Sequence, residues 1–239
     1  MKNVFRIFWE SLKEFWDELF ILVLMNLLTA VLLLPVVTFP PALAGLWSVG
    51  NLVARGSSIE WRDYFGAFKR YFGKSWVFAL INIVVGLLFY VNFNFYAPET
   101  PPFNLSATVS LWVRTFFIFV GALWVLLQMY LFAMLLEQDE QRIKLAFRNS
   151  AILMFANPGF TLLLGIIILI LSAVSILLPA LWAMVTMSLV AVICNMAVQH
   201  LLTPYREKAA AEAQESEGEQ VDLQPVDDVE DRPELSDVS

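Results

Sequence analysis

Long apolar runs alternate with shorter amphipathic stretches over most of the chain. The clearest amphipathic stretch runs from Trp61 to Trp76, where aromatic residues recur at the spacing of one helical face and charged residues occupy most other positions. Ser57 followed by Glu60 predicts a capping box at its start. Rings on one face and cations on the other are typical of a helix lying among lipid headgroups, although soluble proteins also contain amphipathic helices. We predict an interfacial helix near residues 58–74 whose membrane anchors are Trp61, Phe65, Phe68, Lys69, Arg70, Phe72 and Lys74.

The same spacing occurs twice more, near residues 3–17 and, with a single aromatic residue, near residues 140–155. The positions are Phe5, Phe8, Trp9, Leu12, Phe15 and Trp16 in the first stretch, and Ile143, Ala146, Phe147, Ser150, Leu153 and Met154 in the other. The chain can therefore be read as three units, each an interfacial helix followed by a two-span hairpin. The alternative is that the regularity only reflects the abundance of Phe, with 20 copies.

The apolar runs predict six membrane-spanning helices, since about 20 residues cross a hydrocarbon core of roughly 30 Å. We place them near residues 19–38, 41–55, 76–96, 107–136, 159–178 and 180–203. The run at 41–55 is short and rich in small residues, so it is either a short or tilted span or a re-entrant half-helix. The positive-inside rule favours a span, because a re-entrant segment after one full crossing would put the basic clusters on opposite sides.

Composition and charge place the chain in a membrane and orient it. Hydrophobic residues make up 59%, charged residues 15%, and the mean hydropathy is +0.69, unlike soluble domains. Residues 1–206 carry 13 Lys and Arg against 10 Asp and Glu, whereas residues 207–239 carry 2 against 12. In the six-span layout all Lys and Arg except Arg114 and Arg232 lie in membrane-proximal cytoplasmic segments, which predicts that both termini are cytoplasmic. We expect one membrane domain at 1–206 and an acidic, disordered cytoplasmic tail at 207–239, with a helical extension at its start.

The sequence offers little material for catalysis. A single cysteine, Cys194, excludes an internal disulfide, and with one histidine, His200, no zinc-type ligand set can form. Phosphate-binding loops, metalloprotease motifs and intramembrane acid pairs are also missing from the sequence. We therefore expect a protein that is not an enzyme and has no cofactor, no metal site and no nucleic-acid partner.

A few polar residues within the apolar runs are candidates for a polar path. They are Arg114, Asn82, Gln128 and Asn195. Intramembrane polar groups are costly unless they meet a partner or water, so convergence of these four would indicate a solute route. The alternatives are interhelical hydrogen bonds for the amides and, for Arg114, snorkelling to the headgroups or pairing with Glu99.

Part of the chain resembles a known family. The resemblance rests on three motifs, which are Leu34-Pro35-Val36-Val37-Thr38, Pro41-Ala42-Leu43-Ala44-Gly45-Leu46 and Asp63-Tyr64-Phe65-Gly66-Ala67-Phe68-Lys69-Arg70-Tyr71-Phe72. Over roughly residues 15–80 the chain is similar to the YesL-like family of bacterial membrane proteins of unknown function. The resemblance implies an all-helical protein of the bacterial cytoplasmic membrane, from a family whose genes often lie beside carbohydrate uptake systems. The acidic tail is not part of the family pattern, and the family provides no catalytic residues.

Two functions remain in view. The first is an accessory or structural membrane protein that binds anionic lipid headgroups and other membrane subunits, such as a sugar uptake complex. The second is a small-solute transporter or channel with the four candidate side chains facing one cavity. Scattered positions of these side chains would count against the transporter.

Overall fold

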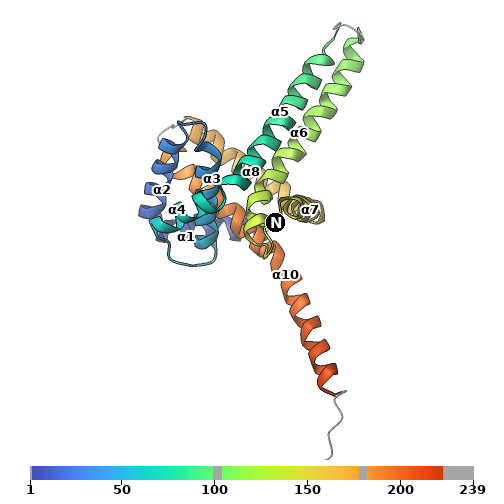
Figure 1. Cartoon of the computed structure of the whole chain (residues 1–239). Helices are drawn as coiled ribbons and strands as arrows, with labels where there is room; N and C mark the ends of the chain where they lie inside the picture. The colour runs from blue at the N-terminus through green and yellow to red at the C-terminus, as the bar shows by residue number, and fades with distance from the viewer. Residues whose placement is uncertain (1, 99–103, 178–181, 223–239) are drawn as a thin grey trace, which may run out of the picture. The chain divides into compact units, whose positions relative to one another are not determined.

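The computed structural model describes residues 2–98, 104–177 and 182–222, and every regular element within them is a helix. Figure 1 shows this all-α architecture. The elements are α1 (Lys2–Asp17), α2 (Leu19–Leu32), α3 (Phe39–Ala54), α4 (Trp61–Arg70), α5 (Phe72–Phe95), α6 (Ala107–Leu136), α7 (Ile143–Ala156), α8 (Pro158–Leu177), the π-helix η1 (Trp182–Thr186) and α10 (Met187–Asp222). The described residues divide into two compact units, with the boundary between His200 and Leu201.

Within the described residues, four helical stretches are long and apolar enough to cross a membrane. They are α5, α6, α8 and the stretch Met184–Gln214 that contains most of α10. The pair α1 and α2, bent by 89° at their junction, would make a fifth if it were one broken span. The chain is therefore a helical protein with the span-like segments of a multi-pass membrane protein, with four to five span candidates.

The two remaining segments expected to cross the membrane form helices that are short for a span. α2 has 14 residues and α3 has 16, which correspond to about 21 and 24 Å against roughly 30 Å of hydrocarbon. The helix in the apolar run at 19–38 ends at Leu32. The Thr38 hydroxyl donates to the Leu32 carbonyl at 2.6 Å and so satisfies a carbonyl that the helix leaves without a partner. Pro40 and Pro41 then open α3, where no intrahelical N–H is needed.

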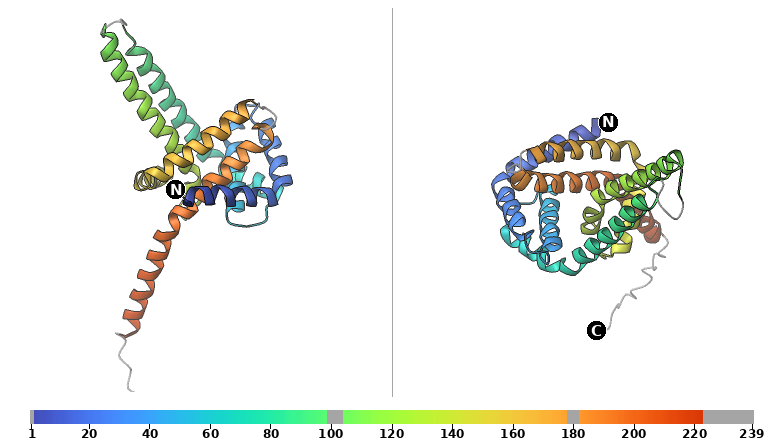
Figure 2. Two further views of the ribbon diagram at one scale, coloured as in Figure 1. Left: turned by 180° about the vertical axis from the view of Figure 1, so that it is seen from behind. Right: turned by 90° about the horizontal axis from the view of Figure 1, so that it is seen from above.

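α3 runs across one end of the hairpin that α5 and α6 form (Figure 2). We call this end the hairpin base; Lys74 Nζ donates to Gln141 Oε1 there at 3.1 Å. The chain just before α3 meets the base through Trp76 Nε1, which donates to the Val37 carbonyl at 3.1 Å. The C-terminal part of α3 meets it through Asn51. Both ends of α3 therefore lie at the same end of the hairpin.

The stretches predicted as interfacial at the start of the chain and after α3 are helices, α1 and α4. On α1, a stripe of buried residues faces the protein, and the neighbouring stripe exposes large aromatic side chains. The buried residues are Val4, Ile7, Ser11 and Phe15, and the exposed aromatics are Phe5, Trp9 and Trp16. One apolar stripe of α1 packs against the protein, and a second apolar stripe is exposed. Such a helix is suited to the edge of a bilayer.

The aromatic face of α4 is divided between protein and surface. Tyr64 is fully buried, and its hydroxyl bonds with Thr29 Oγ1 at 2.9 Å and donates to the Ala42 carbonyl at 3.2 Å. Trp61, by contrast, is 59% exposed. The start of α4 differs from expectation: Glu60 is the N-cap, and Asp63 accepts from its backbone N–H at 2.8 Å. The capping box is thus formed one turn later than a Ser57–Glu60 pair would form it.

α7 corresponds to the third, weaker copy of the amphipathic pattern. Four positions of its predicted face are buried against the rest of the unit, namely Ala146, Ser150, Leu153 and Met154. The pattern therefore marks a face that is buried against the protein, where the interfacial interpretation would turn it toward acyl chains, and α7 packs mainly against α6. Whether the three amphipathic helices descend from one repeated unit stays a prediction.

The second unit begins at Leu201, within α10. The helical extension expected at the start of the tail is present and continues to Asp222, further than the short segment Glu207 to Glu215 suggested. Its Ala, Glu, Gln and Lys residues are strong helix formers, and Lys208 pairs with Glu212 one turn on at 3.6 Å. The rest of the predicted disordered tail, 223–239, lies outside the described residues.

Candidate functional site

Five polar side chains from three helices gather beside the hairpin base. Asn51 and Arg55 lie one turn apart near the end of α3, and Asn195 and Gln199 lie one turn apart on α10. Glu137 is the residue that ends α6. Because residues four apart share a helical face, each pair presents two polar groups to the same neighbour. We refer to these five residues as the Glu137 cluster.

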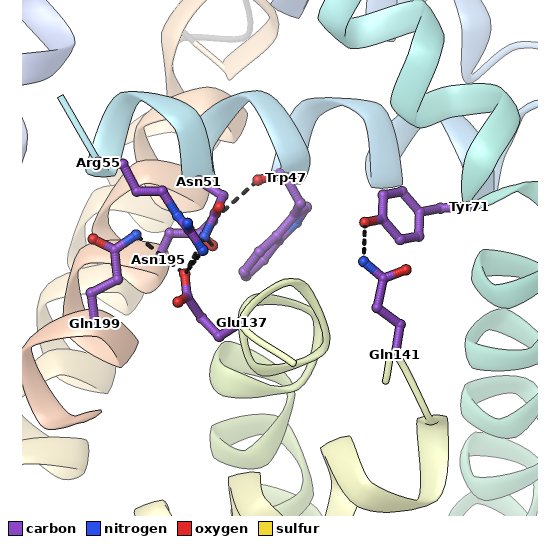
Figure 3. Close-up of polar contacts among 8 residues, drawn as sticks. All are labelled: Trp47, Asn51, Arg55, Tyr71, Glu137, Gln141, Asn195 and Gln199. Carbon is purple, nitrogen blue, oxygen red and sulfur yellow. Dashed lines mark hydrogen bonds and ion pairs between the residues drawn. The ribbon is translucent and has the colours of Figure 1, made fainter. Parts of the chain in front are cut away.

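One carboxylate oxygen is the centre of the cluster. Glu137 Oε1 accepts from Asn51 Nδ2 at 2.7 Å, from Arg55 Nη2 at 3.0 Å and from Gln199 Nε2 at 3.3 Å. Figure 3 shows these side chains pointing toward Glu137 from α3 and α10. The Glu137 side chain is 2% exposed, whereas that of Arg55 is 48% exposed. The pair therefore joins a buried anion to a cation that still reaches solvent.

The two asparagines extend the cluster into the interface between α3 and α10. Asn51 Nδ2 also donates to Asn195 Oδ1 at 3.1 Å, and Asn195 Nδ2 donates to the carbonyls of Trp47 at 3.2 Å and Ala191 at 2.7 Å. The helices approach closely here because of Gly50, where an added Cβ would lie 3.0 Å from the backbone carbon and Cβ of Ala191. The glycine therefore permits the approach that brings the two amides into hydrogen-bonding distance.

The arrangement is suited to fastening helices together. A buried carboxylate is tolerated when donors satisfy it, and here the donors come from two helices other than its own. Within the residues that the structure describes, no three His, Cys, Asp or Glu side chains gather as a metal site would require. The interactions within the Glu137 cluster are hydrogen bonds and one ion pair.

The four candidates for a polar path occupy three different places. Asn82 and Gln128 come together between α5 and α6, with Asn82 Nδ2 3.4 Å from Gln128 Oε1. Trp124 Nε1 donates to Asn82 Oδ1 at 3.0 Å. Asn195 belongs to the Glu137 cluster instead. Arg114 lies over the ring of Phe93, 3.8 Å from its centroid.

Arg114 remains a candidate for contact near the far end of the hairpin. Its Nε is buried and has no hydrogen-bond partner among the described residues. Glu99, suggested as its partner, lies outside the described residues. The guanidinium is therefore held by cation–π contact with Phe93 at its face.

The proposed membrane anchors lie mainly on one edge of α4 and the start of α5. Trp61, Lys69, Arg70 and Phe72 are exposed, and Phe65 and Phe68 are partly buried. Lys74 takes part in a local network, because its Nζ donates to Gln141 Oε1. Gln141 Nε2 in turn donates to the Tyr71 hydroxyl at 2.7 Å, as Figure 3 shows. That network connects the anchor region to the segment following α6.

Sequence reasoning missed the centre of the site. Glu137 lies just beyond the predicted span at 107–136, and neither it nor Asn51 or Arg55 was among the candidate residues. A signal did exist, since Asn51–Arg55 and Asn195–Gln199 are both polar pairs four residues apart on largely apolar helices. Such a pattern indicates a polar face but does not identify the residue that the face meets.

Comparison with known proteins gives one similarity, and it covers less than half of the chain. No curated protein and no solved structure matches the chain. Residues 19–93, from α2 through most of α5, match the family described as "Protein of unknown function, DUF624". This part of the chain is therefore similar to a protein family whose function is unknown.

Proposed function

We propose that the chain is a non-enzymatic integral membrane protein of the bacterial cytoplasmic membrane with an accessory or structural role, linked to carbohydrate uptake. The observation that carries the proposal is the pairing of the polar side chains within the helical unit. Asn51, Glu137 and Asn195 bond to one another or to shared neighbours, and Asn82 bonds to Gln128. Side chains engaged in this way support helix packing.

The lipid-facing surface of the hairpin supports a role in binding other membrane subunits. α5 and α6 expose large apolar side chains along much of their length, including Leu87, Trp112 and Phe119. In a bilayer such a surface is covered by lipid tails or by another apolar helix. The link to carbohydrate uptake comes from the YesL-like resemblance, with which the DUF624 match is consistent.

For the topology, we propose that both termini are cytoplasmic. The three-hairpin layout with six spans remains one arrangement. A second arrangement has four full spans, α5, α6, α8 and α10, and is supported by both ends of α3 lying at the hairpin base. In this arrangement α2 and α3 enter and leave the membrane on the same side. The basic residues before and after them then lie together on the cytoplasmic side, as the positive-inside rule requires.

A flux experiment separates the accessory role from the alternative of a small-solute transporter. The purified full chain is reconstituted in liposomes, and the uptake of labelled sugars is compared with that of protein-free liposomes. The accessory role predicts equal uptake. Flux that is present in the wild type and lost in Asn82→Ala or Gln128→Ala would instead establish the transporter.

The partner is sought by site-specific photocrosslinking in cells. A photoreactive amino acid replaces Trp112, which is 72% exposed on the apolar face. The matched control has the same group at Ser58, an exposed polar position between α3 and α4. An adduct with a sugar-uptake subunit at Trp112 but not at Ser58 supports the proposal. Adducts with lipid alone, at Trp112 and at further exposed positions of α5 and α6, would contradict it.

A further inference from the structure

The outer side of α4 carries two neighbouring rows of side chains, each spaced by four residues. The rows are Trp61, Phe65, Lys69 and Arg62, Gly66, Arg70. Residues four apart lie on the same face of a helix, so the first row has two rings followed by a cation, and the second has a cation on each side of a glycine. Both rows line a shallow hollow of about 460 Å³, which we call the α4 hollow. Its lining residues are Trp61, Arg62, Phe65, Gly66 and Lys69.

Gly66 leaves the centre of the α4 hollow open. A Cβ added there would meet no atom within 4 Å. Arg62 lies four residues before Gly66 and Lys69 three residues after it, so both are its neighbours on the helix surface, and both are exposed. The Arg62 guanidinium also lies over the Trp61 ring, 5.8 Å from its centroid. A group that rests over Gly66 is therefore within reach of two accessible cations.

The cations of the α4 hollow have no acidic partner. Arg62 and Lys69 form no ion pair with any residue that the structure describes. The two nearest acids in sequence, Glu60 and Asp63, serve the start of the helix instead, where each side chain accepts from the backbone N–H of the other. Two accessible cations without an acid favour an anionic ligand, and phosphate oxygens are typical partners of Arg and Lys.

α1 has a corresponding hollow in which the charges balance. It has a volume of about 260 Å³, and its lining residues are Trp9, Leu12, Lys13, Trp16 and Asp17. This lining contains one cation and one acid, and the preceding Arg6 pairs with Glu10 at 3.5 Å. Over its whole length α1 has three Lys or Arg and three Asp or Glu. The two amphipathic helices share exposed rings, but only the α4 hollow combines them with unpaired cations.

The place of α4 in the chain favours a lipid as the source of the anion. α4 leads through Tyr71 directly into α5, whose 24 residues extend over about 36 Å, more than the roughly 30 Å of hydrocarbon. The ends of α5 therefore reach the headgroup layers, and Lys69 precedes α5 by one turn. In the proposed orientation this end is cytoplasmic, where anionic lipids attract basic segments. Trp61, which is 59% exposed, suits the boundary between headgroups and acyl chains.

We propose that the α4 hollow binds the phosphate of an anionic phospholipid of the cytoplasmic leaflet, with Arg62 and Lys69 donating to the phosphate oxygens. The rings of Trp61 and Phe65 then lie beside the first carbons of the acyl chains. This inference rests on the proposed membrane location of the chain and goes beyond the accessory role. Crosslinking from Trp112 tests the accessory role separately, so the failure of one proposal is distinguishable from the failure of the other.

The test is native mass spectrometry of the purified full chain in mild detergent, titrated with phosphatidylglycerol or with phosphatidylcholine of the same acyl chains. The wild type should bind phosphatidylglycerol more tightly, because this lipid has a net negative charge and phosphatidylcholine has none. The double variant Arg62→Gln/Lys69→Gln should weaken phosphatidylglycerol binding about 25-fold, at about fivefold for each cation, and remove the preference. The matched control Arg6→Gln/Lys13→Gln removes the same charge from α1 and should leave the preference unchanged.

A second pair of variants tests the hollow without changing any charge. Gly66→Phe fills the α4 hollow and should weaken phosphatidylglycerol binding, whereas Gly159→Phe, which adds the same ring at an exposed glycine of α8, should not.

Three outcomes would overturn the proposal. Equal weakening by the two double variants would show that net charge alone attracts the lipid. Displacement of the lipid by an equal concentration of inorganic phosphate would show a site for free anions. Equal affinity of the wild type for the two lipids would refute the selection of an anion without reliance on any variant.

Discussion

Replacing Glu137 with Ala tests the idea that its cluster fastens α3, α6 and α10 together. The substitution removes three hydrogen bonds at Oε1, one of them from a cation. Breaking a buried ion pair costs about 3–5 kcal/mol when the surviving charge is trapped. Arg55 is half exposed and can regain water, and Asn51 keeps its bond to Asn195. We therefore expect a loss of about 2–4 kcal/mol in the free energy of unfolding.

The matched control is Glu140→Ala. Glu140 also pairs with an arginine, Arg142, at 2.7 Å, but both side chains are about 70% exposed, at 69% and 71%. Exposed ion pairs contribute less than about 1 kcal/mol. Glu137→Gln retains an acceptor oxygen without the charge, so its effect should lie between those of the two alanine variants.

The assay is thermal unfolding in mild detergent, followed by tryptophan fluorescence and by the fraction that stays monodisperse. In a chain of this size 1 kcal/mol corresponds to roughly 2–4 °C in Tm. Glu137→Ala should therefore lower Tm by roughly 4–16 °C, and Glu140→Ala by no more than a few degrees. A Tm for Glu137→Ala equal to that of Glu140→Ala would refute the fastening role of the cluster.

Three further predictions use other features of the unit. Gly50→Ala should lower Tm and expression because its Cβ would meet the α10 backbone at 3.0 Å, whereas Gly86→Ala, where a Cβ meets nothing within 4 Å, should not lower either. Burial raises the pKa of Tyr64 from 10.0 to about 12. The stability that the neutral phenol provides is thus complete below pH 10 and lost as the pH rises to 12, so Tyr64→Phe should flatten the fall of Tm in that window; an unchanged slope would contradict this. Asn104→Cys should react with an impermeant maleimide from outside intact cells and Ser58→Cys only after permeabilisation; external labelling of the latter would overturn the proposed orientation.

Local sequence patterns were sufficient for the class of protein and for the positions of its long helices. Hydrophobicity alone indicated the long helices α5, α6 and α8, because an unbroken apolar run of about 20 residues has few alternatives to a membrane-spanning helix. Helical periodicity showed which positions of α7 share one face, but not that this face packs on protein. These properties depend on neighbours within one or two turns, which a single sequence displays directly.

Hydrophobicity did not show where the helix within the apolar run at 19–38 ends. The turn after α2 is stabilised by the Thr38 hydroxyl bond to Leu32, and the following prolines begin a new helix. Apolar residues continue through this turn. A hydropathy profile therefore indicates one continuous span, although the backbone leaves α2 and changes direction before α3.

The tertiary structure alone decided which polar groups meet. Arg55 and Glu137 are 82 positions apart, and Asn51 and Asn195 are 144 apart. Periodicity shows which face of a helix a side chain occupies, but the partner across that face depends on how the helices pack. That packing depends in turn on the close approach of α3 and α10 at Gly50. The sequence by itself determined that this chain is helical and suited to a membrane, and the three-dimensional packing determined that a buried carboxylate joins three of its helices.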